Sequence, residues 1–248
     1  MSAAPLVALR NVGKTFSNGT TALAGFDLAL HDGEFVSLLG PSGCGKSTAL
    51  RLIAGLAEPS TGAIQWSRPA RLGVVFQEPT LMPWRTVLGN IRLPLQIAGM
   101  ARAEAEARAQ TALIQVGLGG FERSYPRQLS GGMKMRVAIA RALVTGPGLL
   151  LLDEPFAALD EITRLRLNED LLALWRAAHL TVAFVTHSVF ESVFLSTRIL
   201  VMAPRPGRVV ADIRVATAEP RDEAYRTSIP YNIACREVSA ALKSAMAA

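Results

Sequence analysis

A glycine-rich segment, GPSGCGKST at Gly40–Thr48, carries the residue types that bind phosphate groups. Gly40, Gly45, Lys46 and Ser47 fill the pattern G-x-x-x-x-G-K-[ST]. Glycines let a loop point its backbone N–H groups at an anion, and they let phosphate oxygens approach the main chain. Lys46 would reach the β- and γ-phosphates, and the Ser47 hydroxyl would ligate Mg²⁺. The segment therefore predicts a nucleotide site.

A second segment, LLLLD at Leu149–Asp153, predicts a central parallel strand that ends in acids. Ligands of open α/β sheets bind at this carboxyl edge. Asp153 could hold Mg²⁺, usually through water, and Glu154 could accept a proton from an attacking water. Adjacent acids at a strand end are often plain loop residues, but the phosphate loop upstream favours the functional interpretation.

Two further polar residues follow predicted strands. Gln77 comes directly after Leu72–Phe76, and its amide could meet a metal ion or a water at the γ-phosphate. His187 comes directly after Thr181–Thr186, and it is a candidate to touch a γ-phosphate. A lone Gln in a loop and an isolated His are more often structural, so position at the strand ends carries this prediction.

The stretch Gln128–Leu143 predicts a helix with a bare N-terminus. Ser130 is a good N-cap, and Gly131 and Gly132 leave the first turn without side chains. Two glycines in a first turn lower helix stability, so another requirement favours them. A helix N-terminus of this kind is a second potential anion site.

These residues need elements to position them, and the sequence predicts a strand–loop–helix unit around the phosphate loop. Glu34–Leu39 reads as a buried strand and Ser47–Leu56 as a helix, which places the helix N-terminus at the phosphates. The alternative of a glycine-rich turn without a ligand is disfavoured, because the pattern is long and correctly flanked. The other expected elements are antiparallel strands at Leu6–Phe16 and Phe26–Leu30, short strands at Ala63–Trp66 and Leu72–Phe76, helices at Val87–Ile97, Arg102–Val116, Glu161–Ala178 and Ser188–Leu195, strands at Arg198–Met202 and Arg208–Arg214, and a C-terminal helix within Glu219–Ala248.

Two aromatic features leave alternatives open. Phe16, in the opening strand, is either a face for adenine to stack on or a core aromatic. The loop Pro79–Arg85 contains two prolines, Met82 and Trp84, and it is either a contact surface or a loop folded over a local core.

Composition indicates a globular α/β chain. The 248 residues are 50% hydrophobic and 19% charged, which argues against disorder. The net charge of +6 suits nucleotides, nucleic acid or an anionic membrane surface, but without a Lys/Arg-rich block it fits a solvated surface better. Cys44 and Cys235 show no disulfide or metal spacing, which favours a reducing cytoplasm. We expect no signal peptide and no membrane span.

Taken together, the motifs resemble those of the nucleotide-binding subunit of ATP-binding-cassette (ABC) transporters. The resemblance runs from Leu6 to about Arg214. Its deciding motif is Leu129–Met133 (LSGGM), which resembles the signature sequence that most P-loop enzymes lack. In family terms the other motifs are the Walker A loop Gly40–Thr48, the Q-loop Gln77, the Walker B strand Leu149–Asp153 with Glu154 as catalytic base, the D-loop Ala158–Asp160 and the switch histidine His187.

The resemblance implies ATP and Mg²⁺ as ligands. The implied catalytic residues are Glu154, His187, Lys46 and Gln77, and the implied metal ligands are Ser47, Gln77 and Asp153. The implied ATP contacts are Phe16, Gly40, Pro41, Ser42, Gly43, Cys44, Gly45, Lys46, Ser47 and Thr48. The implied contacts in a partner's site are Ser130, Gly131 and Gly132, and Asp160 is the implied D-loop residue. Two positions depart from the common pattern: Met133 replaces Gln, and Phe16 replaces Tyr but keeps the stacking face.

The fold that the resemblance implies is a P-loop NTPase (RecA-like) α/β core with an N-terminal antiparallel β-subdomain and a helical subdomain inserted between Q-loop and signature. We expect one ABC ATPase domain over residues 1–248. Within it, residues 1–88 and 145–215 would form the β-subdomain and core, 89–144 the helical subdomain with the signature, and 216–248 a C-terminal extension.

The implied function is ATP hydrolysis that energises a bacterial-type importer from the cytoplasmic face of the inner membrane. Expected partners are a second copy in a head-to-tail, ATP-dependent dimer, transmembrane permease subunits and, indirectly, a solute-binding protein, with no nucleic acid. Met133, Phe76–Asn90 and Phe194–Val210 resemble the subgroup for nitrate, sulfonates and taurine. Alternatives are a pyrimidine-type solute, a non-transport ABC ATPase acting on nucleic acid or ribosomes, and a free-standing P-loop kinase.

Overall fold

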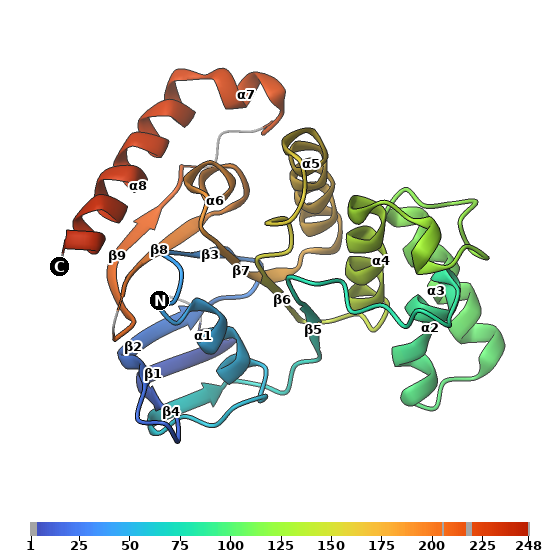
Figure 1. Cartoon of the computed structure of the whole chain (residues 1–248), viewed down its shortest axis with the longest axis horizontal. Coiled ribbons are helices and arrows are strands. Elements are labelled where there is room, and N and C mark those ends of the chain that lie inside the picture. The colour runs from blue at the N-terminus through green and yellow to red at the C-terminus, as the bar shows by residue number, and fades with distance from the viewer. Residues whose placement is uncertain (1–3, 205, 217–219, 248) are drawn as a thin grey trace. The chain divides into compact units, whose positions relative to one another are not determined.

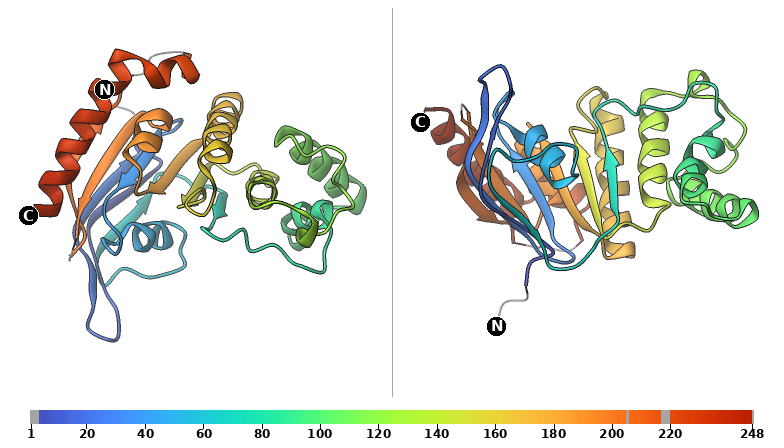
Figure 2. Two further views of the ribbon diagram at one scale, coloured as in Figure 1. Left: turned by 45° about the horizontal axis from the view of Figure 1, so that its top comes forward. Right: turned by 90° about the horizontal axis from the view of Figure 1, so that it is seen from below.

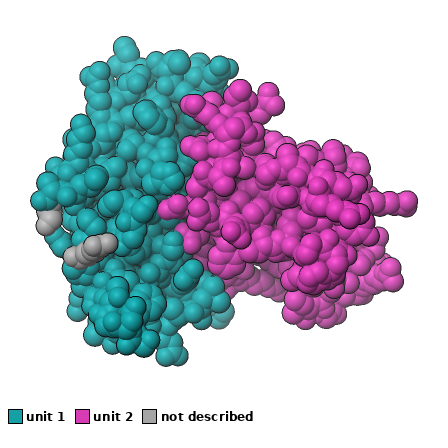
Figure 3. Space-filling view, in the orientation of Figure 1, with its two compact units in different colours: residues 1–69, 179–248 teal, residues 70–178 magenta. Residues whose placement is uncertain are grey.

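The computed structural model describes residues 4–204, 206–216 and 220–247. The chain forms two compact units, which Figure 3 shows in different colours. Unit 1 comprises residues 1–69 and 179–248, and unit 2 comprises residues 70–178. The subdomain boundaries expected from the motifs are a different division of the chain, and they stay a prediction.

Unit 1 begins with an antiparallel sheet in the order β2-β1-β4 (Figure 1). Its strands are β1 (Val7–Thr15), β2 (Thr21–Leu30) and β4 (Thr61–Trp66). Apolar side chains such as Leu9 and Val12 are buried, and they anchor one strand of this sheet in the core. The expected N-terminal antiparallel β-structure is confirmed.

The second strand group of unit 1 is built on β3 (Phe35–Leu39), which pairs in parallel with β7 (Thr181–Thr186) on one side and β8 (Arg198–Ala203) on the other. β9 (Arg208–Arg214) pairs antiparallel to β8. Every residue of β3 and β7 is buried. This explains why both strands are mainly apolar, as in a parallel sheet covered on both faces.

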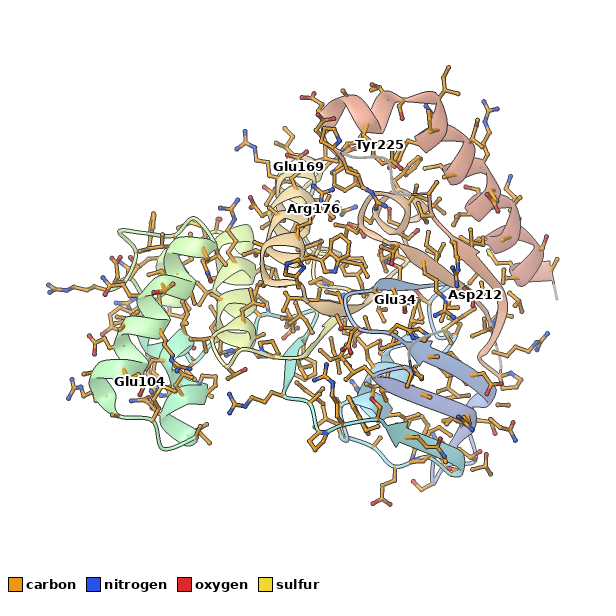
Figure 4. The ribbon with its side chains drawn as sticks, turned by 180° about the vertical axis from the view of Figure 1, so that it is seen from behind. Glu34, Glu104, Glu169, Arg176, Asp212 and Tyr225 are labelled. Atoms are coloured by element: carbon orange, nitrogen blue, oxygen red, sulfur yellow. The ribbon has the colours of Figure 1, made fainter. Side chains whose placement is uncertain are left out.

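An arginine on β8 links this group to neighbouring strands of unit 1. Arg198 donates from Nε and Nη2 to the two Asp212 carboxylate oxygens at 2.7 and 2.6 Å, and from Nη1 to the Ala29 carbonyl at 2.8 Å. Glu34 lies 3.8 Å from the same guanidinium, and Figure 4 shows Glu34 and Asp212 on this part of the unit. The Asp212 hydrogen bonds raise the pKa of Arg198, although burial opposes them. The arginine therefore ties β2 and β9 to β8.

The C-terminal segment of unit 1 is not the single helix that the sequence predicts. The structure has α7 (Glu223–Thr227) and α8 (Ile229–Ala247), separated at Ser228, whose backbone is extended. The Ser228 hydroxyl accepts a hydrogen bond from the Tyr231 N–H, so this serine starts a new helix instead of continuing the first. Residues 219 and 248 of the predicted segment lie outside the described residues.

α8 lies along β8 and β9 of unit 1 (Figures 1 and 2). The buried Tyr225 ring is 5.3 Å from the Tyr231 ring and 6.4 Å from the Phe194 ring, centroid to centroid. These contacts anchor the C-terminal helices to the unit. The remaining helices of unit 1, within the part of the chain that is described, are α1 (Lys46–Ile53) and α6 (Val189–Leu195).

β2 starts earlier than the sequence predicts. The expected strand Phe26–Leu30 is extended back to Thr21, through Gly25 at φ 60°. The segment from Thr21 to Gly25 is rich in Ala and Gly, which have low β-propensity. Pairing with β1, where the register shifts beside this glycine, supplies the stability that local propensity lacks.

Unit 2 contains two parallel strands and a set of helices. β5 (Leu72–Val75) pairs in parallel with β6 (Leu149–Asp153). The described helices are α2 (Val87–Ile97), α3 (Arg102–Gln115), the 3₁₀ turn Pro126–Gln128, α4 (Gly131–Leu143) and α5 (Glu161–Ala178). α2, α3 and α4 pack on one another, so the helical character expected of this stretch is confirmed. Among the described helices, none is long and apolar enough to cross a membrane.

Candidate functional site

The phosphate loop joins β3 to α1 in unit 1, as the sequence predicts. Gly45 is the N-cap of α1 at φ 93°, and it carries no side chain that could cover the first N–H groups of the helix. Lys46 is 4% exposed, and its ammonium donates to the carbonyls of Gly40 at 2.8 Å and Pro41 at 3.1 Å. The loop thus turns its own cation inward beside a bare helix N-terminus, which suits a polyphosphate.

Two glycines of this loop differ in the space around them, which gives a test. A Cβ on Gly45 would lie 2.7 Å from the Ala22 carbonyl and from Leu23, whereas a Cβ on Gly43 meets nothing within 4 Å. Both have positive φ, so alanine at either position should destabilise the fold by about 1–2 kcal/mol. We expect Gly45→Ala to lose about 1–3 kcal/mol more than Gly43→Ala, because overpacking adds to the backbone strain. Equal losses of unfolding free energy for the two variants, measured by chemical denaturation, would contradict the close packing around Gly45.

The register of β3 and β7 brings His187 to the phosphate loop. Leu39 pairs with Thr186, so the next residues, Gly40 and His187, leave the same edge of unit 1 side by side. The His187 side chain is exposed at this edge. The expectation that His187 lies at the carboxyl edge of the strands, next to the loop, therefore has a structural basis within one unit.

The residues on either side of His187 are fixed by a buried carboxylate. The Thr186 hydroxyl donates to Glu191 Oε2 and accepts from the Ser188 N–H at 3.0 Å. The Ser188 hydroxyl accepts from the Glu191 N–H at 3.3 Å and caps α6. Glu191 is 7% exposed. Sequence reasoning missed this residue, and the available signal was Ser188 followed three residues later by Glu191, the spacing of a capping box.

Phe16 lies on the surface of unit 1. Its side chain is 41% exposed, and the Lys14 ammonium lies 5.5 Å from the ring centroid. This exposure decides against the core-aromatic alternative. A ring face beside a cation is a chemically suitable surface for a nucleotide base.

In unit 2, the register of β5 and β6 brings a second group of predicted residues together. Val75 pairs with Leu152, so Gln77 and the acids Asp153 and Glu154 leave the same edge. Glu154 has φ 46°, in the left-handed region that non-glycine residues seldom adopt. Backbone strain of this kind persists only where the surroundings impose it, and it is common at catalytic sites.

The bare helix N-terminus predicted in unit 2 is the start of α4. Ser130 is its N-cap, and the hydroxyl accepts from the Met133 N–H at 3.3 Å. Ser130 and Gly131 are exposed, whereas Gly132 is buried. A Cβ on Gly132 would lie 2.6 Å from Thr163 Cγ2, so a larger residue here would have to displace the Thr163 side chain of α5. The exposed Gly131 is less constrained, with Leu159 at 3.2 Å from its Cβ position.

Comparison with known proteins identifies this arrangement. The model of the family described as ABC transporter matches residues 23–157. The chain belongs to the ABC transporter family. A taurine import ATP-binding protein of Yersinia pestis is 47% identical over 198 residues, 77% of this chain and 78% of the relative. An aliphatic sulfonates import ATP-binding protein of Pseudomonas syringae is 47% identical over 219 residues, 88% of this chain and 89% of the relative.

A solved structure supports the same identification. The dimeric post-hydrolysis state of an ATP-binding cassette bound to ADP and Pi superposes with a TM-score of 0.76 at 34% identity, covering 86% of this chain and all of that one. The chain is therefore an ABC-type ATPase, with the mixed α/β cassette fold that the sequence predicts.

In this ABC ATPase, Asp160, which the sequence predicts to be the D-loop residue, caps α5. Its Oδ1 accepts from the Thr163 N–H at 3.0 Å, and its carbonyl accepts from the Arg164 N–H at 3.0 Å. The Thr163 hydrogen bonds are the main reason that the pKa of Asp160 is lowered. The aspartate thus has a local structural role, and it stays charged at neutral pH.

The loop after Gln77 is held in place by hydrogen bonds to the Asn90 side chain. The Asn90 side chain is fully buried; its Oδ1 accepts from the Met82 N–H at 2.7 Å, and its Nδ2 donates to the carbonyls of Met82, Arg85 and Thr86 at 3.0–3.2 Å. Trp84 remains 72% exposed. The loop is therefore ordered by hydrogen bonds to a buried asparagine, and it still presents an aromatic side chain to solvent.

Unit 2 also has a polar groove of about 570 Å³ that sequence reasoning missed. Its lining comes from the starts of α2 and α3 and from the segment before the 3₁₀ turn: Thr86, Leu88, Gly89, Arg92, Arg102, Glu106, Gln110, Gly120, Glu122 and Arg123. An ion pair at 2.7 Å between Arg92 and Glu106 lies within this lining. No local pattern marks the groove, because its residues come from three separate stretches.

Proposed function

We propose that this chain is the ATP-hydrolysing subunit of an importer for a small anionic solute of the sulfonate, taurine or nitrate class. The observation that carries the ATPase mechanism is the pair of strand registers, which place Gly40 beside His187 in unit 1 and Gln77 beside Asp153 and Glu154 in unit 2. The taurine and aliphatic sulfonates import names of the relatives support the solute class.

In the proposed mechanism, the loop Gly40–Thr48 and Lys46 bind the phosphates of ATP, and Phe16 stacks on adenine. Glu154 accepts a proton from the attacking water, and His187 contacts the γ-phosphate. Hydroxyl, amide and carboxylate oxygens are the donors that Mg²⁺ prefers, so Ser47, Gln77 and, through water, Asp153 would hold it. When bound, the ion offsets charge on the phosphates.

We further propose that the site is completed by a second copy of the chain. In a head-to-tail dimer, the α4 N-terminus of the partner would donate N–H groups to the γ-phosphate through Ser130, Gly131 and Gly132. The exposed N-terminus of α4 and the dimeric state of the solved relative support this arrangement. ATP would then hold the dimer together, and hydrolysis would open it.

The partners proposed for import are transmembrane permease subunits, and through them a solute-binding protein, at the cytoplasmic face of the membrane. The loop Pro79–Arg85 with the exposed Trp84, and the polar groove of unit 2, are the surfaces we assign to the permease. The helical segment 89–144 would transmit the motion. A pyrimidine-type solute stays an alternative within the same mechanism.

Co-purification tests the importer proposal. We expect the tagged chain, extracted from its own membranes in mild detergent, to carry permease subunits, and the ATPase rate of that complex to rise with taurine, an alkanesulfonate or nitrate when its solute-binding protein is present. If only a pyrimidine stimulated the ATPase rate, the solute would be a pyrimidine and not an anion of the sulfonate, taurine or nitrate class. Recovery with nucleic acid or ribosomes and without a permease would overturn the importer proposal in favour of a non-transport ATPase.

A further inference from the structure

The short helix α6 begins two residues after His187, and α8 supplies a hydrogen bond to its first turn. The Tyr231 hydroxyl of α8 donates to the Phe190 carbonyl at 3.0 Å. Tyr231 is buried, and burial raises the pKa of its hydroxyl, so the group keeps the proton that it donates. Both residues lie in unit 1. The C-terminal segment therefore contacts α6 only three residues beyond His187.

The other end of α6 is held by Arg221, which lies just before α7. Its Nη1 donates to the carbonyls of Phe194 and Ser196, both at 2.9 Å. Carbonyls at the end of a helix lack partners within the helix, and a cation there is favourable. Arg226 of α7 adds a contact, with its Cζ 3.4 Å from the centroid of the Phe194 ring. Because α6 has only seven residues, too few for a helix to be stable in isolation, these outside contacts supply part of its stability.

α6 in turn fixes the backbone on both sides of His187. Glu191 of α6 accepts from the Thr186 hydroxyl, and its N–H donates to Ser188 Oγ. Thr186 and Ser188 are the two chain neighbours of His187. A shift or rotation of α6 would therefore move the exposed imidazole between them. The contacts form one continuous path within unit 1, from the C-terminal segment through α6 to His187.

We propose that Tyr231 and Arg221 are positioning residues, which hold α6 so that His187 stands where it can contact the γ-phosphate. The inference rests on the proposed function, in which His187 makes that contact. It gives the C-terminal segment, which none of the predicted motifs includes, a part in ATP hydrolysis. The first binding of ATP depends on the loop Gly40–Thr48, which none of these hydrogen bonds joins.

The first test observes His187 directly by NMR. The chain has three histidines, so isotope-labelled imidazole groups give a simple spectrum, and His187→Ala identifies the His187 signal. In the nucleotide-free chain, we expect this signal to shift or broaden in Tyr231→Phe and more strongly in Arg221→Met. The other two histidine signals should stay in place. Tyr231→Phe removes only the hydroxyl and keeps the aromatic ring, so it perturbs the packing least.

The second test separates kcat for ATP hydrolysis from the affinity for a fluorescent ATP analogue. We expect kcat to fall about threefold in Tyr231→Phe and about tenfold in Arg221→Met, with nucleotide affinity within about twofold of wild type. On the residual rate of His187→Ala, Arg221→Met should cause little further loss, because the group that it positions is gone. Arg236→Met is the matched control, since Arg236 is an exposed arginine of α8. It should change neither the His187 signal nor kcat.

Two kinds of result would overturn the proposal. One is an unchanged His187 signal or an unchanged kcat in either folded variant. The other is an equal fractional loss of kcat from Arg221→Met in the presence and in the absence of the His187 side chain. If Arg221→Met does not fold, Tyr231→Phe decides by both measurements. Wild-type hydrolysis in His187→Ala would instead refute the underlying role of His187, whereas the NMR signal tests the contact path without ATP.

Discussion

Replacing Glu154 by glutamine is expected to lower kcat for ATP hydrolysis by about 10²–10⁴-fold and to leave ATP binding intact. Glutamine keeps the shape of the side chain and can occupy the same strained backbone, whose φ is 46°. It cannot accept the proton of the attacking water. The residues proposed to bind the phosphates, in the loop Gly40–Thr48, belong to the other unit and are unchanged.

The measurement is steady-state phosphate release together with equilibrium binding of ATP. Glu161→Gln is the matched control, because Glu161 is an exposed carboxylate in the first turn of α5, only a few residues further along the chain. It should retain wild-type turnover. Wild-type turnover in Glu154→Gln itself would remove the catalytic-base assignment.

Replacing Ser130 by arginine is expected to abolish at least about 99% of hydrolysis without weakening ATP binding to a single chain. The hydroxyl that caps α4 is lost, and a long cation takes its place at an exposed helix N-terminus, where positive charge is unfavourable. If Ser130 acts on the nucleotide of a partner, its own Walker A loop still binds ATP.

Two control variants separate the loss of the capping hydroxyl from the addition of a cation as causes of the lost hydrolysis. Ser130→Thr keeps a capping hydroxyl and should retain most of the activity. Gln115→Arg adds the same cation at the exposed end of α3 in the same unit and should have little effect. Equal loss of binding and hydrolysis in Ser130→Arg would argue against a site shared between two copies.

Elements whose residues satisfy their own pattern could be predicted from the sequence. The helix Val87–Ile97 and the strand Leu149–Asp153 have the expected bounds, because helical spacing and an uninterrupted apolar run each mark one type of element. The beginning of β2 and the break at Ser228 could not be predicted. They depend on pairing with β1 and on a serine that caps the following helix.

The residues of the candidate site also fall into those that could be predicted from the sequence and those that could not. The positions of Gln77, Glu154 and His187 at strand ends could be predicted, because parallel strands within each unit deliver their carboxyl ends to the same edge of that unit. Asn90 and Arg141 donate hydrogen bonds to carbonyls of the loop after Gln77, and no local sequence pattern indicates such contacts. One of the two glycines at the start of α4 also has a local cause, since a Cβ on Gly132 would crowd the Thr163 side chain.

We propose that one chain supplies only half of each ATP site. Native mass spectrometry of Glu154→Gln with Mg²⁺ and ATP tests it most directly, because bound nucleotides and chains are counted in the same species. We expect two chains with two ATP molecules, and a single chain with one ATP when Ser130→Arg is added. A single chain with one ATP for Glu154→Gln, or a dimer unaffected by Ser130→Arg, would contradict it.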